Sequence, residues 1–337
     1  EAGIEAQIRQ VLSDLNTHDM ANLAQRGKKV RDLVRNAALP PLLQDDILKH
    51  YRRMEQDYGK NCAVAVRSSA TAEDLPDASF AGQQETFLNI RGDEALLDAC
   101  KRCFASLFTD RAISYRVDKG FGHFDVYLSI GVQKMIRSDS ACAGVIFSID
   151  TERGLKDAVY ITGAWGLGEN VVQGAVNPDD YYVFKPTLKT GKRPIVGKTL
   201  GKKQLKMIYN EDAASSERPV LNIETTPEER SRFVISDDEI LQLARWAVII
   251  EEHYNKAMDI EWAKDGDGKS VGTGKLFIVQ ARPETVHSQR AANIIETYVL
   301  KERGKVIVAG QAVGSRIGQG RAHVIHSASE ISQFSPG

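Results

Sequence analysis

The sequence predicts an α+β protein, because stretches of different periodicity follow one another along the chain. Residues 1–60 repeat apolar side chains at helical spacing. Between residues 61 and 210, short runs of β-branched and apolar residues are separated by Gly and Pro, which is typical of strands joined by turns. A candidate hairpin follows within residues 258–283. The length of 337 residues favours about two domains.

The composition is that of a globular protein, with 42% hydrophobic and 26% charged residues. The formal net charge of −1 argues against a surface that binds nucleic acid or anionic membranes, so we expect neither partner. No apolar run approaches the ~20 residues that cross a bilayer. The first residues do not form a signal peptide and there is no initiator Met, so we expect a piece of a longer protein.

The four cysteines are Cys62, Cys100, Cys103 and Cys142. Cys100 and Cys103 have the spacing of a CxxC motif, but they lie in a helical pattern and no second pair is in range. We therefore expect buried, reduced thiols rather than disulfides or a metal site. Such thiols are typical of a cytoplasmic protein.

Helices are expected around residues 4–15, 30–34 and 43–54, where apolar side chains recur every three or four positions. Another helical pattern runs over residues 93–119. Thr226 and Ser236 are each followed three residues later by Glu, which predicts a capping box at the start of two further helices.

Strands are expected at residues 62–67, 87–90, 126–136, 144–149, 158–162 and 180–185, and near Ile195 and Met207. Residues 211–225 are polar and predict a loop. The turn at residues 163–170 has GxxGxG spacing, but no clear βαβ unit with a following acidic residue surrounds it. It therefore does not predict a Rossmann site.

The strand at 62–67 ends in Arg67 and runs into small hydroxyl residues. A guanidinium at a strand end can be aimed at an anion. The loop that follows leads into residues 82–86, whose small residues and hydroxyl can present backbone N–H groups to phosphate. The chain contains no Walker A motif, and a plain surface turn into a strand is the alternative.

The candidate hairpin places four polar side chains on one surface. Because strand residues alternate between faces, Asp259 and Glu261 share one face, and Gln280 and Arg282 share one face. The opposite faces would hold residues 258, 260 and 262 on the first strand, and residues 277, 279 and 281 on the second. Carboxylate and amide oxygens suit Mg²⁺, and an arginine suits phosphate. The alternative is an amphipathic hairpin with a surface salt bridge.

Residues 65–86, residues 166–178 and the two hairpin strands together resemble the phosphoenolpyruvate synthase (pyruvate, water dikinase) family. The similarity covers nearly the whole chain from about residue 10. The resemblance implies an ATP-grasp-like nucleotide-binding domain over residues 1–290, with a C-terminal subdomain at about 226–290. It implies a linker at 291–305 and, at 306–337, the incomplete opening of a phosphohistidine domain.

The resemblance also implies roles for individual residues. Arg67 and Arg282 would hold the ATP phosphates and act in catalysis, and Asp259 would contact the ribose or the metal shell. Glu261 and Gln280 would be ligands of Mg²⁺. The loop over the phosphates would comprise Gly82, Gln83, Gln84 and Thr86. The hinge beside adenine, read mainly through backbone groups, would comprise Gln133, Lys134, Met135 and Ile136.

By the same resemblance, the whole protein would convert ATP, pyruvate and water into AMP, phosphoenolpyruvate and phosphate through a phosphohistidine. Pyruvate would bind only through a missing C-terminal domain, which would also mediate any homodimer. None of His287, His323 and His326 lies in the family's Thr-His motif, so this portion should bind Mg-ATP without turnover. The family's N-terminal segment, whose Lys contacts phosphate, is absent. The alternatives are pyruvate, phosphate dikinase, an antibiotic phosphotransferase or a non-catalytic nucleotide-binding module.

Overall fold

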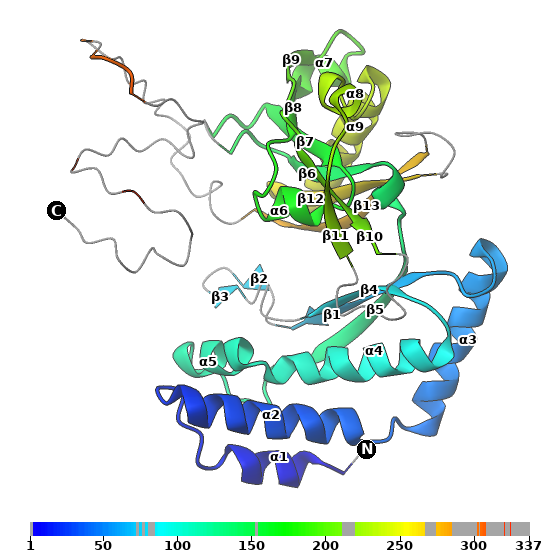
Figure 1. The fold of residues 1–337 in the computed structure, drawn as a ribbon, viewed down its shortest axis with the longest axis vertical. Helices are drawn as coiled ribbons and strands as arrows, with labels where there is room; N and C mark the ends of the chain where they lie inside the picture. Colours follow the sequence, from blue (N-terminus) through cyan, green and yellow to red (C-terminus); the bar gives the residue numbers. More distant parts are fainter. Residues whose placement is uncertain are drawn as a thin grey trace.

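Two antiparallel sheets, one in each half of the chain, define the fold (Figure 1). The computed structural model describes residues 3–71, 85–151, 154–210, 220–266 and 274–284, the backbone of 74–75 and 78–79, and isolated residues 302, 304–307, 320 and 324. The expected linker and the opening of a phosphohistidine domain lie almost entirely outside these residues. We call residues 3–134 the N-terminal lobe and residues 142–284 the C-terminal lobe.

The N-terminal lobe is a three-stranded sheet covered on one face by helices (Figure 1). Its strand order is β4-β1-β5, and both pairings are antiparallel. Val64 and Val66 of β1 are fully buried against Leu96 and Cys100 of α4, so the apolar face of the sheet points toward the helices. The elements are α1 (Glu5–Leu12), α2 (Met20–Asn36), α3 (Pro41–Tyr58), β1 (Val64–Ala70), β2 (Asp74–Leu75), β3 (Ala78–Ser79), β4 (Thr86–Ile90), α4 (Asp93–Ala105), α5 (Asp110–Asp118) and β5 (Leu128–Lys134).

The helical prediction for residues 93–119 is confirmed, with one interruption. The pattern over residues 93–119 is not one helix, because a short 3₁₀ turn at Ser106–Phe108 (η1) separates α4 from α5. Thr109 is the reason for the break. Its backbone is extended, and its hydroxyl accepts a hydrogen bond from the Ala112 N–H at 3.2 Å, which caps a new helix.

The C-terminal lobe is a six-stranded sheet with the order β13-β12-β6-β7-β8-β9. Helix α9 packs on one face and buries Ile240, Leu243 and Ala247 against Ile146, Ile260 and other sheet residues. Both predicted capping boxes are present, at Thr226 and at Ser236. The elements are η2 (Ser138–Ser140), β6 (Cys142–Phe147), β7 (Ala158–Trp165), α6 (Glu169–Val172), β8 (Asp179–Phe184), α7 (Lys185–Lys189), β9 (Ile195–Thr199), α8 (Pro227–Ser231), α9 (Asp237–Tyr254), β12 (Met258–Asp265) and β13 (Lys275–Pro283).

A separate hairpin of β10 (Leu205–Tyr209) and β11 (Val220–Glu224) extends from this lobe toward the other (Figure 1). Residues 220–224 were expected to be part of a loop, and that expectation is wrong. They pair with β10 over five residue pairs, although their side chains are mostly exposed. A strand without a buried face lacks the hydrophobic alternation from which strands are predicted.

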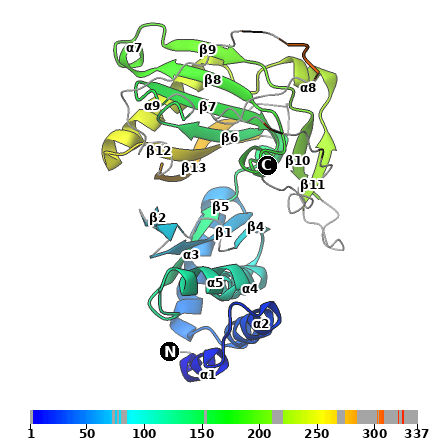
Figure 2. The same cartoon turned by 90° about the vertical axis from the view of Figure 1, so that its left-hand side faces the viewer.

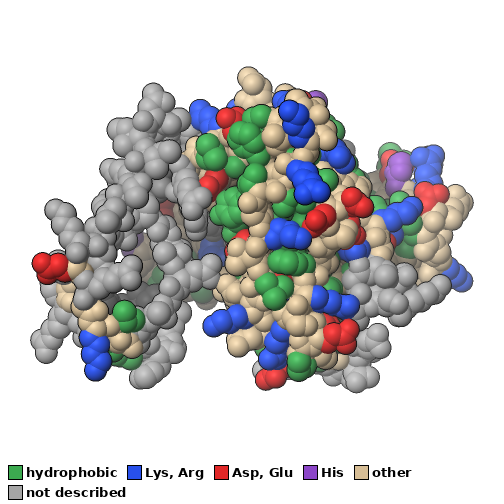
Figure 3. Space-filling view, turned by 90° about the horizontal axis from the view of Figure 1, so that it is seen from above, with side chains coloured by type: hydrophobic (Ala, Val, Ile, Leu, Met, Phe, Trp, Pro, Cys, Tyr) green, Lys and Arg blue, Asp and Glu red, His purple; other side chains and the backbone are tan. Residues whose placement is uncertain are grey.

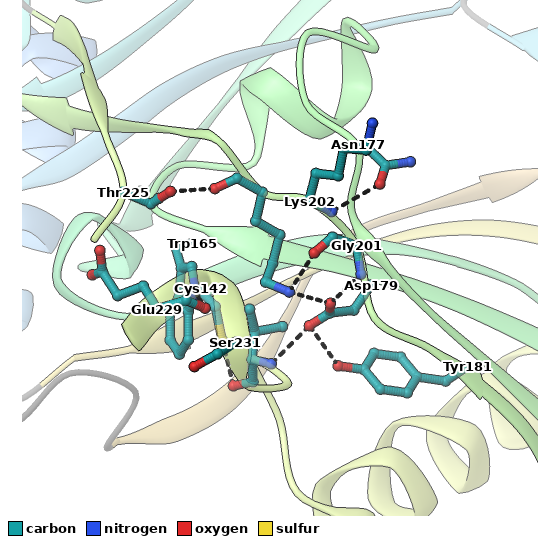
Figure 4. A network of polar contacts seen from close by, with 12 residues as sticks. Cys142, Trp165, Asn177, Asp179, Tyr181, Gly201, Lys202, Thr225, Glu229 and Ser231 are labelled. Carbon is teal, nitrogen blue, oxygen red and sulfur yellow. Dashed lines mark hydrogen bonds and ion pairs between the residues drawn. The ribbon is translucent and has the colours of Figure 1, made fainter. Parts of the chain in front are cut away.

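A buried ion pair anchors this hairpin to the large sheet. Lys203 lies just before β10 and forms an ion pair with Asp179 of β8, and both side chains are fully buried. The carboxylate of Asp179 also accepts hydrogen bonds from the N–H groups of Gly201 and Val234, at 2.8 and 2.9 Å. Tyr181 donates a further hydrogen bond to it at 3.2 Å (Figure 4). Each oxygen of the buried carboxylate is therefore satisfied.

The surface carries no dominating charge on the face shown in Figure 3, where basic and acidic side chains are interspersed. No helix among the described residues is long and apolar enough to cross a membrane. The four cysteines are free and buried, as predicted. Burial raises the pKa of the Cys100 thiol to about 11.

Candidate functional site

A cavity of about 380 Å³ has walls from both lobes. Figure 2 shows the two sheets that contribute to these walls, with the sheet of the N-terminal lobe below the larger sheet of the C-terminal lobe. The N-terminal lobe contributes β1, β4 and the end of β5, and the C-terminal lobe contributes β6, α6, β12 and β13. A volume of a few hundred cubic ångströms is the usual size of a small-molecule site. Six of the predicted nucleotide-binding residues line it from the N-terminal lobe and the two positions after it: Arg67, Thr86, Gln133, Lys134, Met135 and Ile136.

Strands β12 and β13 form the predicted hairpin and bring the polar side chains together. Asp259 lies opposite Arg282, and Glu261 lies opposite Gln280. On the other face of β12, Met258, Ile260 and Trp262 are at most 1% exposed, as the alternation predicts. The four polar residues therefore share the face that points away from the α9 core.

A β-bulge in β13 changes which of its residues lie on each face of the sheet. Glu261 pairs with Gln280, but Trp262 pairs with Ile278, so Val279 is an extra residue on β13. The extra residue shifts the alternation of side chains along β13. Phe277 therefore pairs with Ala263 and lies on the same face of the sheet as Gln280, which is the face toward the cavity. Val279 also packs there and lines the cavity. The placement of residues 277 and 279 on the opposite face was therefore wrong.

Arg67 crosses from the N-terminal lobe to this hairpin. Its Nη1 donates to the carbonyl oxygen of Val279 at 3.0 Å, and its Nη2 donates to Oε1 of Gln280. The same Nη2 lies 3.7 Å from Oε2 of Glu261. The bulge explains the first contact, because Val279 has no partner residue on β12. The sequence separation of 212 residues makes this a long-range contact between the lobes.

Arg282 is held on the same face by Asp259. The Nε and Nη2 atoms of Arg282 lie 2.9 and 2.7 Å from Oδ2 of Asp259. The guanidinium is about one third exposed, whereas the carboxylate is mostly buried. Asp259 therefore orients the arginine on this face of the hairpin.

The donor chemistry at Glu261 and Gln280 fits a magnesium ion. Both side chains supply hard oxygen atoms, and both direct an oxygen toward one cationic group, the Arg67 guanidinium. In the described part of the chain, no cluster of three or more His, Cys, Asp or Glu side chains suits a metal. Two protein ligands agree with the usual coordination of Mg²⁺ in nucleotide sites, where phosphate and water complete the shell.

The predicted hinge residues occupy the edge of the N-terminal sheet and the turn after it. The Met135 N–H donates to the Ala63 carbonyl at 2.9 Å, so it is already satisfied. In an antiparallel ladder the neighbouring residue, Lys134, then directs its backbone groups away from β1. The backbone of Lys134 is thus better placed to meet a ligand than the N–H of Met135.

The predicted phosphate loop is only partly described. Thr86 lies opposite Arg67 in the β1–β4 pairing and lines the cavity. Gly82, Gln83 and Gln84 lie outside the described residues, so their predicted role has no structural counterpart here.

The glycine-rich turn at residues 163–170 forms part of the cavity wall, although its GxxGxG spacing did not predict a nucleotide site. Leu167, Gly168, Glu169 and Gln173 all line the cavity. Gly166 has φ of +85°, and a Cβ there would lie 2.4 Å from the carbonyl oxygen of Met207, so a glycine is required. In the sequence, the family resemblance of residues 166–178 was the feature that could have assigned this turn to the site, and the GxxGxG pattern was not.

Comparison with known proteins identifies the family of the chain. Residues 1–302 match the family described as "Pyruvate phosphate dikinase, AMP/ATP-binding domain". The chain belongs to this family. Its α+β architecture is consistent with the ATP-grasp-like fold expected from the sequence, and the resemblance to phosphoenolpyruvate synthases is confirmed.

Several relatives of this AMP/ATP-binding domain are phosphoenolpyruvate synthases. Those of Synechocystis sp., Pseudomonas aeruginosa and Escherichia coli are 56%, 52% and 50% identical to the chain. The alignments cover 100% of the chain but 42%, 42% and 41% of the respective relatives. The chain thus spans about two fifths of the length of these proteins.

Proposed function

We propose that the chain binds Mg-ATP in the cavity between the two lobes. One observation carries the proposal: Arg67 of one lobe meets Glu261 and Gln280 of the other at the cavity wall. Arg67 and Arg282 would hold the phosphates, and the edge of β5 with residues 135–136 would hold the adenine. Gly82, Gln83, Gln84 and Thr86 would cover the phosphates, and Asp259 would contact the ribose or the metal shell.

We infer that the whole protein is a phosphoenolpyruvate synthase. It would make phosphoenolpyruvate from pyruvate, using ATP and water and releasing AMP and phosphate, with a histidine on another domain as the phosphoryl carrier. A magnesium ion at Glu261 and Gln280 would supply neutralising charge at the phosphate oxygens. The arginines would orient the phosphates and stabilise the charge that develops on them during transfer.

The family membership and the identity of 50% or more to the three relatives named above support this proposal. The domain boundaries would then be the nucleotide-binding domain at 1–290, a linker at 291–305 and the start of the carrier domain from 306. The six-stranded sheet includes β6 to β9 as well as β12 and β13, so it spans residues on both sides of position 226, where a subdomain was expected to begin.

Calorimetric titration with Mg-ATP tests the binding. We expect Glu261→Ala to weaken Mg-ATP binding about tenfold or more, because a charged ligand of the metal is lost. Glu252→Ala is the matched control, since Glu252 is exposed and pairs with Lys189 on the C-terminal lobe. Equal affinities of the wild type and Glu261→Ala would contradict the metal assignment.

Turnover is tested by incubating the chain with Mg-ATP and pyruvate and assaying AMP and phosphoenolpyruvate. We expect neither product, since the histidine that carries the phosphoryl group would lie on another domain, and none of His287, His323 and His326 lies in the family's motif. Pyruvate-dependent formation of both products in equal amounts would overturn this part of the proposal.

A further inference from the structure

The two residues proposed as metal ligands are already bound to a cation of the protein itself. Gln280 accepts a hydrogen bond from Nη2 of Arg67, and Glu261 lies 3.7 Å from the same nitrogen. The side chains of Arg67 and Glu261 are 22% and 32% exposed, so the pair is only partly screened by water. A metal ion that approaches these oxygens must first displace the guanidinium.

The charges on this face balance before any ligand binds. Glu261 lies beside Arg67, and Asp259 is paired with Arg282. If both arginines moved to phosphate oxygens, two carboxylates would remain without a cationic partner. One divalent cation carries the charge that restores the balance.

We propose that Arg67 and the metal ion exchange places, so that the metal binds at Glu261 and Gln280 only when nucleotide phosphate draws Arg67 away. This inference rests on the proposed function and specifies how the site is controlled. Free divalent cation competes with Arg67 and binds weakly. Phosphate offers the planar fork of the guanidinium two charged oxygens, which are better partners than the Val279 carbonyl, one amide oxygen and a carboxylate at 3.7 Å.

The exchange couples the two ligands. Nucleotide strengthens metal binding by removing the competitor, and by linkage the metal strengthens nucleotide binding by the same factor. The resting contact also protects the site, because an arginine held against Glu261 prevents an isolated carboxylate from collecting a metal in the absence of ATP.

Binding of Mn²⁺ to the 337-residue chain, followed by electron paramagnetic resonance of the free ion, tests the exchange. The titration is done with and without ATP for the wild type and for Arg67→Met, which removes the charge and keeps the length of the side chain. Arg52→Met is the matched control. Arg52 is bound to Asp93 and Glu55, so its loss also releases carboxylates, but at a site remote from the hairpin.

Without nucleotide, we expect Arg67→Met to bind Mn²⁺ about tenfold more tightly than the wild type, since a charged hydrogen-bond donor no longer competes. Arg52→Met should bind as the wild type does. With ATP, the wild type should bind Mn²⁺ about tenfold more tightly than without it. Arg67→Gln is the second variant if Arg67→Met is not folded by circular dichroism.

Two results would overturn the exchange while leaving the proposed function intact. One is wild-type Mn²⁺ affinity that is equally high with and without ATP. The other is nucleotide-dependent binding in the wild type together with unchanged nucleotide-free affinity in Arg67→Met and Arg67→Gln. If ATP itself fails to bind to the wild type at any Mn²⁺ concentration, the proposed function fails and the exchange fails with it, whereas tighter Mn²⁺ binding by Arg67→Met would then show only that Arg67 competes with the metal.

Discussion

Lys134 and Asp265 join the two lobes at the edge of the cavity, with Nζ of Lys134 2.6 Å from Oδ2 of Asp265. The second oxygen of Asp265 accepts a hydrogen bond from the Arg137 N–H at 2.8 Å, on the segment that connects the lobes. The Lys134 ammonium also lies between the rings of Tyr58 and Phe277, at 5.5 and 5.7 Å from their centroids. Lys134, itself one of the predicted hinge residues, thus contacts the last helix before β1 and the β12–β13 hairpin.

Asp265→Asn should loosen this junction without removing the bond to Arg137. We expect the free energy of unfolding to fall by roughly 1 kcal/mol, because the pair is only partly buried. ATP binding should weaken as well, since the walls of the cavity are less firmly positioned. Urea unfolding and calorimetry measure the two effects. The comparable substitution Asp237→Asn, at an exposed pair with Lys198, should change neither, and an equal loss in both variants would argue against a role for the junction.

Arg282→Lys should weaken ATP binding although the charge is retained. An ammonium on a flexible chain cannot bridge two phosphate oxygens as a guanidinium does. We expect a loss of about 1.5–3 kcal/mol in calorimetric titration with Mg-ATP. Arg230→Lys serves as the control, because Arg230 pairs with Glu224 away from the cavity lining. Unchanged affinity in Arg282→Lys would exclude a forked phosphate contact.

Lys203→Met should be strongly destabilising, because it leaves the fully buried Asp179 without its cationic partner. Removal of one member of a buried ion pair costs about 3–5 kcal/mol. Urea unfolding should show this loss. Lys189→Met, at an exposed pair with Glu252, should cost at most about 1 kcal/mol. Similar stabilities for the two variants would mean that the buried pair does not hold the β10–β11 hairpin in place.

His123 should make the free energy of unfolding depend on pH, at pH values below the usual pKa of histidine. Burial, together with the nearby Arg116 guanidinium, lowers the pKa of His123 from 6.5 in the folded protein. The unfolded chain therefore takes up a proton at a higher pH than the folded chain does. This contribution to stability is fully present above about pH 6.5 and is lost as the pH falls through the interval below it.

The variant His123→Gln tests this dependence, since glutamine does not titrate and can still accept the hydrogen bond that Arg116 Nε donates at 3.3 Å. Urea unfolding at about pH 7.5 and about pH 5.5 should show a larger loss of stability for the wild type than for His123→Gln. Identical losses would assign the acid sensitivity to other groups.

Local patterns in the sequence predicted local structure well. Alternation placed Asp259 and Glu261 on one face of β12, and the position of Glu three residues after Thr226 and Ser236 predicted both capping boxes. These features depend on neighbours a few residues away, so the sequence around them contains the necessary information.

Long-range arrangement was beyond such patterns. No periodicity indicates that β6 pairs with β12, more than a hundred residues later, or that Arg67 contacts Val279 and Gln280. The bulge at Val279 escaped prediction because strict alternation assumes equal numbers of residues in paired strands. Only the family resemblance assigned Arg67 and Gln280 to one site, and the structure gives the contact between them.

The bulge also lets strand β13 place both apolar and polar side chains on one face of the sheet. Val279 gives the cavity an apolar side chain, and Phe277 packs in the same cluster. Gln280 and Arg282, a few residues along, add polar side chains to the same face of the hairpin. In a regular ladder these two pairs would point to opposite sides of the sheet. The length of β13 is therefore part of the binding site: deletion of Val279 would leave Phe277 and Gln280 on one face in a regular ladder, whereas an unbulged pairing that kept Val279 would move one flank of the strand to the other face.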